Sequence, residues 1–153
     1  MTLKYHEGFS QQIQKWPFKP LPLIVKYLEE NIGKMKATSL VDLGCGEGLL
    51  ETELSKKNFF KSIFSYDLVS TKEHVKSCDI RKLPHANGSL DVAVFCLSLM
   101  GTNYLEFLAE AVRVLKVQGW MIISEVSSRV VSVKGFQDML DQIGLQLHYY
   151  VSN

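Results

Sequence analysis

The stretch Val41-Asp42-Leu43-Gly44-Cys45-Gly46-Glu47-Gly48 decides how this chain folds. The residues from Ser39 to Leu43 are apolar and partly β-branched, which predicts a short strand. Glycines at alternate positions follow, and Leu49, Leu50 and Leu54 then recur at helical spacing. This order predicts a strand, a tight turn and a helix.

The glycine turn predicts a ligand site, which Gly44, Cys45 and Gly46 should line. Glycine tolerates positive φ and lets a ligand lie against bare backbone, and the helix that opens near Glu47 presents unpaired N–H groups. The third glycine comes one residue too early for the dinucleotide fingerprint, and the Lys-Ser/Thr of a P-loop is missing. Asp42 precedes the turn, which contains no basic residue, so a ligand with positive charge fits. S-adenosylmethionine is such a ligand; a purely structural turn is the alternative.

Acidic residues follow the next two predicted strands. Asp67 closes the strand 62–66 and lies 19 residues after Gly48. An acid at that distance in a nucleoside-binding α/β sheet accepts hydrogen bonds from the ribose hydroxyls. Asp79 and Ile80 follow a weaker strand at 74–78, where they could meet the amino group and the ring face of an adenine. The alternative for both acids is a solvated position at a strand end.

The run 91–97 is continuously apolar after its first residue, which predicts a strand buried on both faces. Its carboxyl end should lie beside the glycine turn, where open α/β sheets bind ligands. We therefore expect Ser98, Met100 and Asn103 to line a substrate pocket, although Asn103 could equally cap the helix that follows. With further strands predicted at 120–126 and 145–151, the fold class is α/β, a doubly wound and mostly parallel sheet with helices on both faces.

The amino-acid composition limits the number of domains and the classes of protein that the chain can belong to. The chain has 153 residues, net charge +1 and ordinary globular composition, so one domain without a strong basic field is expected. Its three cysteines are widely spaced and form no C-x-x-C pair, so neither a disulfide framework nor a metal site is predicted. No apolar run approaches the roughly 20 residues that cross a bilayer. We expect an intracellular monomer without membrane contact.

The sequence divides into residues 1–38, a segment and helix that pack on the domain, and residues 39–153, the ligand-binding domain. Residues 1–20 are aromatic and interrupted by proline, which predicts a lead-in segment, and a helix should run from about Leu21 to Gly33. Gly119 is expected to break the helix that precedes the strand 120–126. The C-terminal strand 145–151 would be the sixth.

The combination of the glycine turn, the two acids after strands and the buried strand 91–97 resembles a class I S-adenosylmethionine-dependent methyltransferase. Further runs resemble the ribosomal RNA-processing protein 8 (nucleomethylin) family: the lead-in pattern Tyr5-His6-x-Gly8-Phe9, the pair Trp16-Pro17, the run Asp91 to Asn103 and the run Ser124 to Arg129. Class I methyltransferases end with a seventh, antiparallel strand, and this sequence stops one strand short. Either the sequence is a piece of a longer chain or the sheet is completed in another way.

The resemblance implies a nucleolar, hence nuclear, enzyme that methylates position 1 of an adenine in large-subunit ribosomal RNA. It also implies partners in a chromatin-silencing complex at ribosomal DNA, so a cofactor-binding module of that complex is the alternative, as is a methyltransferase for another substrate. The family's cofactor contacts correspond here to His6, Gly44, Asp67, Asp79, Ile80 and Cys96. His6 would close over the cofactor as a lid, so deleting residues 1–15 should weaken cofactor binding and leave the domain folded. No catalytic side chain is assigned, because the sulfonium supplies the leaving group.

Overall fold

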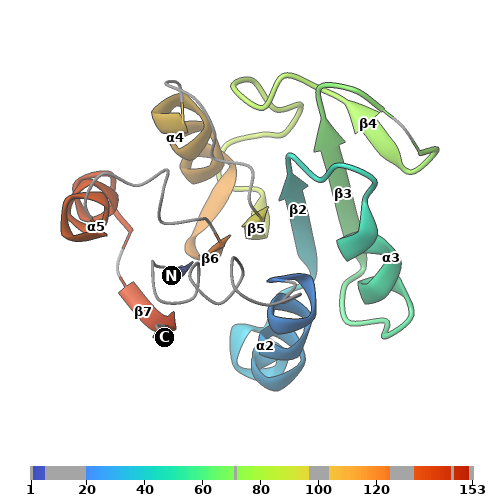
Figure 1. Ribbon diagram of the computed structural model, residues 1–153, viewed down its shortest axis with the longest axis horizontal. Helices are drawn as coiled ribbons and strands as arrows, with labels where there is room; N and C mark the ends of the chain where they lie inside the picture. The colour runs from blue at the N-terminus through green and yellow to red at the C-terminus, as the bar shows by residue number, and fades with distance from the viewer. Residues whose placement is uncertain are drawn as a thin grey trace, which may run out of the picture.

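The computed structural model describes residues 2–5, 20–70, 72–96, 104–124, 133–145 and 147–151. These residues form a sheet with the strand order β4-β3-β2-β5-β6-β1-β7, and every pairing in it is parallel. In Figure 1 the sheet runs from β4 at the right to β7 at the left. The predicted doubly wound α/β fold is confirmed.

Strands and helices alternate along most of the chain. The strands are β1 (Thr2–Tyr5), β2 (Ser39–Leu43), β3 (Ser62–Asp67), β4 (Val75–Ser77), β5 (Leu90–Cys96), β6 (Leu115–Ser124) and β7 (Leu147–Val151). The helices are α2 (Pro20–Met35), α3 (Leu49–Ser55), α4 (Tyr104–Val114) and α5 (Val133–Gln142).

The order of the central strands creates a switch point. From β2 the chain adds β3 and then β4 on one side, and returns to place β5 on the other side of β2. Open α/β sheets bind ligands where the strand order reverses, outside the carboxyl ends of the strands. Here that position lies after Leu43 and Phe95, which are neighbours in the β2–β5 register. The glycine turn therefore emerges at the switch point.

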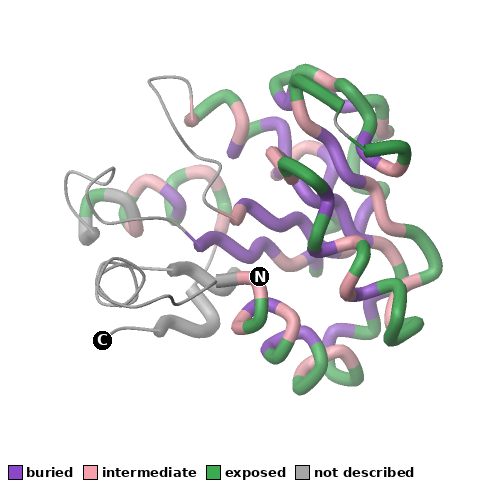
Figure 2. Tube along the Cα trace, turned by 45° about the vertical axis from the view of Figure 1, so that its right-hand side comes forward, coloured by how far each residue is buried: buried purple, intermediate pink, exposed green. Residues whose placement is uncertain are grey.

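Helices cover both faces of the sheet, as Figure 1 shows. Side chains alternate along β2, so Leu40 and Val41 belong to different cores. On one face, α2 and α3 bury Ile24, Leu28, Leu50 and Leu54. On the other, α4 and α5 bury Leu108, Ala111, Val114 and Leu140. Figure 2 shows the buried residues concentrated along the central strands.

The N-terminal segment takes part in the sheet, which the sequence did not predict. Residues 2–5 form β1, which lies between β6 and β7 and pairs with both in parallel. In the described residues the sheet thus has seven strands, and the antiparallel strand that class I methyltransferases place at this position is not among them. Deleting residues 1–15 would remove this strand, so the expectation that such a deletion leaves the domain intact is corrected. The substitution His6→Ala is the cleaner test of a lid.

Two predicted boundaries are also corrected. Helix α2 continues through Gly33 and ends at Met35, before Lys36 with a φ of 51°. An interior glycine costs a helix only about 1 kcal/mol relative to alanine, which packing can outweigh. Gly119 does not break α4, because that helix ends at Val114 and Gly119 lies within β6. The β5–β6 register shifts between Leu90 and Val92, which marks an irregularity in this part of the pairing.

Asp91 fixes the amino ends of three strands. Its Oδ2 accepts hydrogen bonds from the amides of Thr38 and Ser39 at 2.9 and 3.1 Å and from both hydroxyls at 3.2 and 3.1 Å. Its Oδ1 lies 3.0 Å from Nζ of Lys116. Burial opposes ionisation of this carboxyl, but these donors outweigh it and lower its pKa to about 2. The ionised carboxylate therefore stabilises the fold.

We predict that Asp91→Asn destabilises the protein by about 2 kcal/mol, because a pKa lowered from 3.8 to about 2 corresponds to free energy of that order. The melting temperature should fall by about 4 to 8 °C at pH 7. A folded pKa below the unfolded value gives stability that is present above pH 4 and is lost as the pH falls toward 2. The variant should lose this part of the pH dependence.

Asp138→Asn is the matched control, since Asp138 is exposed on α5 and forms no ion pair with any described residue. Thermal unfolding followed by circular dichroism from pH 2 to 7 provides the measurement. Equal melting curves for the two variants at pH 7 would contradict the assigned role of Asp91.

Candidate functional site

The glycine turn is held against the end of β3 by backbone hydrogen bonds. The amides of Gly44 and Cys45 both donate to the carbonyl oxygen of Tyr66, at 2.9 and 3.0 Å. The amide of Gly46 donates to Oδ2 of Asp67 at 2.7 Å. Gly44, Gly46 and Gly48 all have positive φ, between 59° and 74°, which explains why the turn needs glycine there. The structure therefore brings the turn and Asp67 together, as the sequence spacing predicted.

Asp67 keeps acceptor capacity for a ligand. Its Oδ1 accepts the amide of Leu68 at 2.7 Å, and its Oδ2 accepts that of Gly46. A carboxylate has about four lone-pair positions, so one remains on each oxygen. Two neighbouring hydroxyl groups, such as those of a ribose, are donors that suit this arrangement.

Asp42 is the most unusual side chain of the site. It is 3% exposed, and its Oδ1 has no hydrogen-bond partner among the residues that the structure describes. Burial, followed by the negative charges of Asp67 and Glu51, raises its pKa to about 7. Glu51 itself accepts a hydrogen bond from the buried hydroxyl of Ser65 at 2.6 Å. Three carboxyl groups from β2, α3 and β3 thus act on one another.

These carboxyl groups lack a cationic partner within the described part of the chain: no ion pair there includes Asp42, Glu51 or Asp67. Ser124, the last residue of β6, lies in register with Cys96, and its buried Oγ likewise has no hydrogen-bond partner in the described ranges. A buried carboxyl group is costly unless it is paired, so the site suits a ligand that brings positive charge and hydrogen-bond donors. The ammonium and sulfonium groups of S-adenosylmethionine meet this requirement.

The two residues predicted to contact the adenine, Asp79 and Ile80, differ in exposure. Asp79 is about half exposed and accepts hydrogen bonds from Nε and Nη2 of Arg81, with 2.8 Å between Nη2 and Oδ2 of Asp79. Hydrogen bonds from Arg81 lower the pKa of Asp79, and a second contact at 3.6 Å joins Arg81 to Glu106 on α4. Ile80 is buried in the core under α4. Contacts of Asp79 and Ile80 with an adenine stay predictions, and Asp79 would share its carboxylate with Arg81.

The two cysteines of the predicted site are half-buried and form no disulfide. Burial and the charge of Asp42 raise the pKa of the Cys45 thiol to about 12, so it is protonated at neutral pH. Cys96 ends β5 next to the turn. The remaining predicted residues lie outside the described part of the chain: His6, Ser98, Met100 and Asn103.

His74 belongs to the site and was missed from the sequence. Its Nε2 lies 3.0 Å from the carbonyl oxygen of Gly48, so the loop before β4 is attached to the glycine turn. A Cβ built on Gly48 would collide with the imidazole ring of His74 and lie 2.9 Å from Cγ2 of Val75. The contact joins positions 26 residues apart, so no local pattern announces it.

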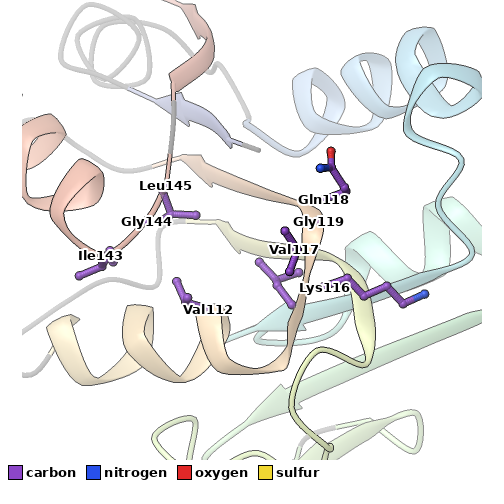
Figure 3. A pocket seen from close by; sticks show the side chains of 9 residues that line it. Val112, Lys116, Val117, Gln118, Gly119, Ile143, Gly144 and Leu145 are labelled. Atoms are coloured by element: carbon purple, nitrogen blue, oxygen red, sulfur yellow. The ribbon is translucent and has the colours of Figure 1, made fainter.

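A groove of about 490 Å³ lies elsewhere, between α4, the first half of β6 and the loop after α5. Figure 3 shows Val112, Val117, Ile143 and Leu145 around it. It contains none of the predicted site residues. Within the ranges that the structure describes, no group of three His, Cys, Asp or Glu side chains could hold a metal ion, and no helix has the length and apolarity of a membrane span.

The geometry agrees with what comparison with known proteins finds. Residues 1–153 match a family described as hypothetical methyltransferase. The chain belongs to this methyltransferase family. It is 44% identical over 142 residues to ribosomal RNA-processing protein 8 of Caenorhabditis briggsae. The matching region covers 93% of this chain and 41% of that protein.

A second relative, from Schizosaccharomyces pombe, is named 25S rRNA (adenine(645)-N(1))-methyltransferase. It is 39% identical over 149 residues, covering 93% of this chain and 46% of that protein. The chain thus spans less than half the length of these two relatives. The resemblance to the ribosomal RNA-processing protein 8 family is confirmed.

Solved structures support the fold. A SAM dependent methyltransferase from Archaeoglobus fulgidus superimposes with a TM-score of 0.62 at 18% identity, covering 82% of this chain and 69% of the other. One from Aquifex aeolicus gives 0.58 at 18% identity, covering 77% and 79%. The chain therefore has the class I methyltransferase fold.

We predict that Gly48→Ala lowers the melting temperature of the protein more than Gly46→Ala does. Both positions have positive φ, which costs alanine about 1 kcal/mol or more. A Cβ at Gly48 also strikes His74, whereas a Cβ at Gly46 meets nothing within 4 Å. The difference between the two melting temperatures, measured by circular dichroism without ligand, therefore reports the steric contact.

The double variant Gly48→Ala/His74→Ala serves as the control. Removing the imidazole should recover part of the stability that Gly48→Ala loses. If the double variant melts no higher than Gly48→Ala, the contact with His74 does not shape the turn.

A further prediction concerns pH and Asp42. Its folded pKa, about 7, exceeds the usual 3.8, so the folded state binds a proton more tightly than the unfolded state. Asp42 therefore costs stability progressively as the pH rises from 4 to 7, by roughly 2 to 4 kcal/mol. We expect Asp42→Asn to melt at a higher temperature than the wild type at pH 8 and at a similar temperature near pH 4.

The difference between the two melting curves isolates Asp42 from the other titrating groups. A difference that does not change between pH 4 and 8 would show that Asp42 is not a buried, unpaired carboxyl group.

Proposed function

We propose that this chain is the cofactor-binding and catalytic domain of an S-adenosylmethionine-dependent RNA methyltransferase, which forms 1-methyladenosine in large-subunit ribosomal RNA. The observation that carries the proposal is the buried Asp42, whose Oδ1 has no partner in the part of the chain that the structure describes, beside a glycine turn and Asp67 in a chain of the methyltransferase family. The name of the Schizosaccharomyces pombe relative supports adenine N1 as the acceptor atom.

The residues of the site would divide the work of binding. Asp67 would accept the ribose hydroxyls through the lone pairs that its backbone donors leave free. Asp42 and Glu51 would face the positively charged part of the cofactor, because they form the acidic cluster at the turn. Asp79, Ile80 and Cys96 would lie along the adenine end, and His6 would cover the cofactor from the N-terminal segment.

When bound, S-adenosylmethionine supplies the methyl group on a sulfonium that is its own leaving group. N1 of adenine carries a free lone pair, so no side chain has to remove a proton from it. The base gains the positive charge that the sulfur loses, and the site keeps the same net charge. The protein therefore contributes mainly position, which can be worth several kcal/mol of a barrier.

The acceptor base must reach the switch point unpaired. N1 lies on the pairing edge of adenine, so the nucleotide has to be in a loop or to be turned out of its stem. Ser98, Met100 and Asn103 follow β5 directly, which makes them our candidates for contacts with the base. A protein that acts on nascent ribosomal RNA would work in the nucleolus, and we propose this location and a monomeric state.

We predict that Asp67→Ala weakens binding of S-adenosylhomocysteine by about 10- to 150-fold. Each hydrogen bond to a charged acceptor is worth about 1.5 to 3 kcal/mol, and the ribose would lose such bonds. Because Asp67 also holds the amide of Gly46, Asp67→Asn is the informative companion. The asparagine keeps one acceptor oxygen and should bind with intermediate affinity. Equal affinities for wild type and Asp67→Ala, measured by calorimetry, would place the ribose elsewhere.

The activity itself is tested with the purified chain, S-adenosylmethionine labelled in the methyl group, and large-subunit ribosomal RNA from cells that lack the modification. After digestion to nucleosides, mass spectrometry should find labelled 1-methyladenosine, and Asp67→Ala should reduce the yield in proportion to its loss of affinity. Label in another nucleoside would contradict the proposed acceptor. Cofactor binding without any transfer to RNA would favour the cofactor-binding module over the enzyme.

A further inference from the structure

Lysines gather at the amino ends of β2 and β3, at the opposite edge of the sheet from the candidate site. We call this surface the basic edge; it consists of Lys34, Lys36, Lys56, Lys57 and Lys61, all of them exposed. They come from three separate places in the chain: the end of α2, the end of α3 and the residue before β3.

Contacts between these segments bring the lysines to one place. The amide of Lys61 donates to the carbonyl oxygen of Thr38 at 2.8 Å, which joins the start of β3 to the residues after α2. Nζ of Lys57 lies 3.4 Å from Oε2 of Glu29, which joins the end of α3 to α2. The basic edge is therefore a product of the fold.

The acids near this surface are already neutralised. Glu29 pairs with Lys57, and Glu53 pairs with Lys56 at 3.3 Å. Asp91 pairs with Lys116 and accepts four hydrogen bonds from residues 38 and 39. What remains is a set of three lysines without an ion pair to any described residue: Lys34, Lys36 and Lys61. The surface thus keeps an excess of positive charge.

The opposite edge has the opposite character. Within the described residues, Asp42, Glu51 and Asp67 form no ion pair, so acidic groups without a cationic partner surround the glycine turn at this edge, which suits a cationic cofactor. A polyanion that delivers one base to the acidic edge must have its phosphates held elsewhere.

We propose that the basic edge is the surface that holds the phosphate backbone of the RNA substrate, remote from the methyl-transfer site. This inference rests on the proposed function, since it takes RNA as the substrate. Strand β2 has five residues, so the two edges are about 16 Å apart at about 3.3 Å a residue. That distance corresponds to a few nucleotides, and a stem gripped at one edge can present a loop at the other.

The chemistry of lysine sets the kind of recognition. Ammonium groups on flexible stems bind phosphate as point charges, without the paired geometry of arginine. Contacts of this type position nucleic acid and do not read its sequence. They also release counterions, so binding through this surface should weaken steeply as salt is added.

The test compares two triple variants with the same change of charge. Lys34→Gln/Lys36→Gln/Lys61→Gln neutralises the unpaired lysines of the basic edge. Lys72→Gln/Lys76→Gln/Lys82→Gln neutralises three exposed lysines near β4 and is the control. Binding of a fluorescently labelled RNA stem-loop with an adenine in its loop is measured by anisotropy across a range of salt concentrations, with S-adenosylhomocysteine present.

The basic-edge variant should bind the stem-loop at least about tenfold more weakly than wild type at low salt. The plot of the logarithm of the association constant against the logarithm of the salt concentration should become less steep, its negative slope shrinking by about 2 to 3, as expected for three lost phosphate contacts. The control should change either quantity only slightly. Both variants should bind S-adenosylhomocysteine like the wild type, which shows that they are folded.

Three results would overturn the proposal: no RNA binding by the wild type, unchanged binding by the basic-edge variant, or equal weakening in both variants. Equal weakening would show that overall charge matters and the basic edge does not. If the basic edge binds acidic proteins and not RNA, the basic-edge variant should bind the RNA as tightly as the wild type does. The proposed function fails if the protein does not bind the cofactor or does not transfer the methyl group. These measurements are separate from RNA binding, so the two proposals can fail independently.

Discussion

The parallel pairing of β2 with β3 on one side and with β5 on the other decides where every acidic group of the candidate site lies. Parallel strands end at the same edge, so the glycine turn, Asp67 and Cys96 emerge together. The turn is then fixed by amide donors that find acceptors on β3, including the 2.7 Å hydrogen bond from Gly46 to Asp67. Without this pairing, the carboxylate of Asp67 would not reach the amide of Gly46.

Two aspartates at opposite ends of the sheet show how environment separates identical side chains. Asp91 has its donors supplied by the neighbouring segment and by Lys116, so its pKa is about 2 and its charge stabilises the fold. Asp42 is buried and faces other carboxyl groups, so its pKa is about 7, and one of its oxygens has no partner among the described residues. Buried groups with such perturbed pKa values are typical of functional sites. The difference separates a structural aspartate from one that we propose to bind a ligand.

Beyond β6, the described sheet continues with β1, which the N-terminal residues 2–5 form. Strand β1 lies where class I methyltransferases place their last strand, although it runs parallel to its neighbours. Its carboxyl end points toward the same edge as the glycine turn, since all the pairings are parallel. Tyr5, the last described residue of β1, therefore lies at the end of the sheet where a cofactor would bind.

The sequence by itself determined the order of strands and helices, the glycine turn with its positive φ, and the spacing that carries Asp67 to the next strand end. These features depend on local patterns of apolar residues and glycine, which act over a few positions. Tertiary structure decided the rest, because it joins residues far apart in the chain. The contact of His74 with Gly48, the pairing of Arg81 with Glu106 and the unpaired state of Asp42 arise only when separate segments meet. So does the strand formed by residues 2–5, since a short edge segment becomes a strand only if a neighbour accepts its hydrogen bonds.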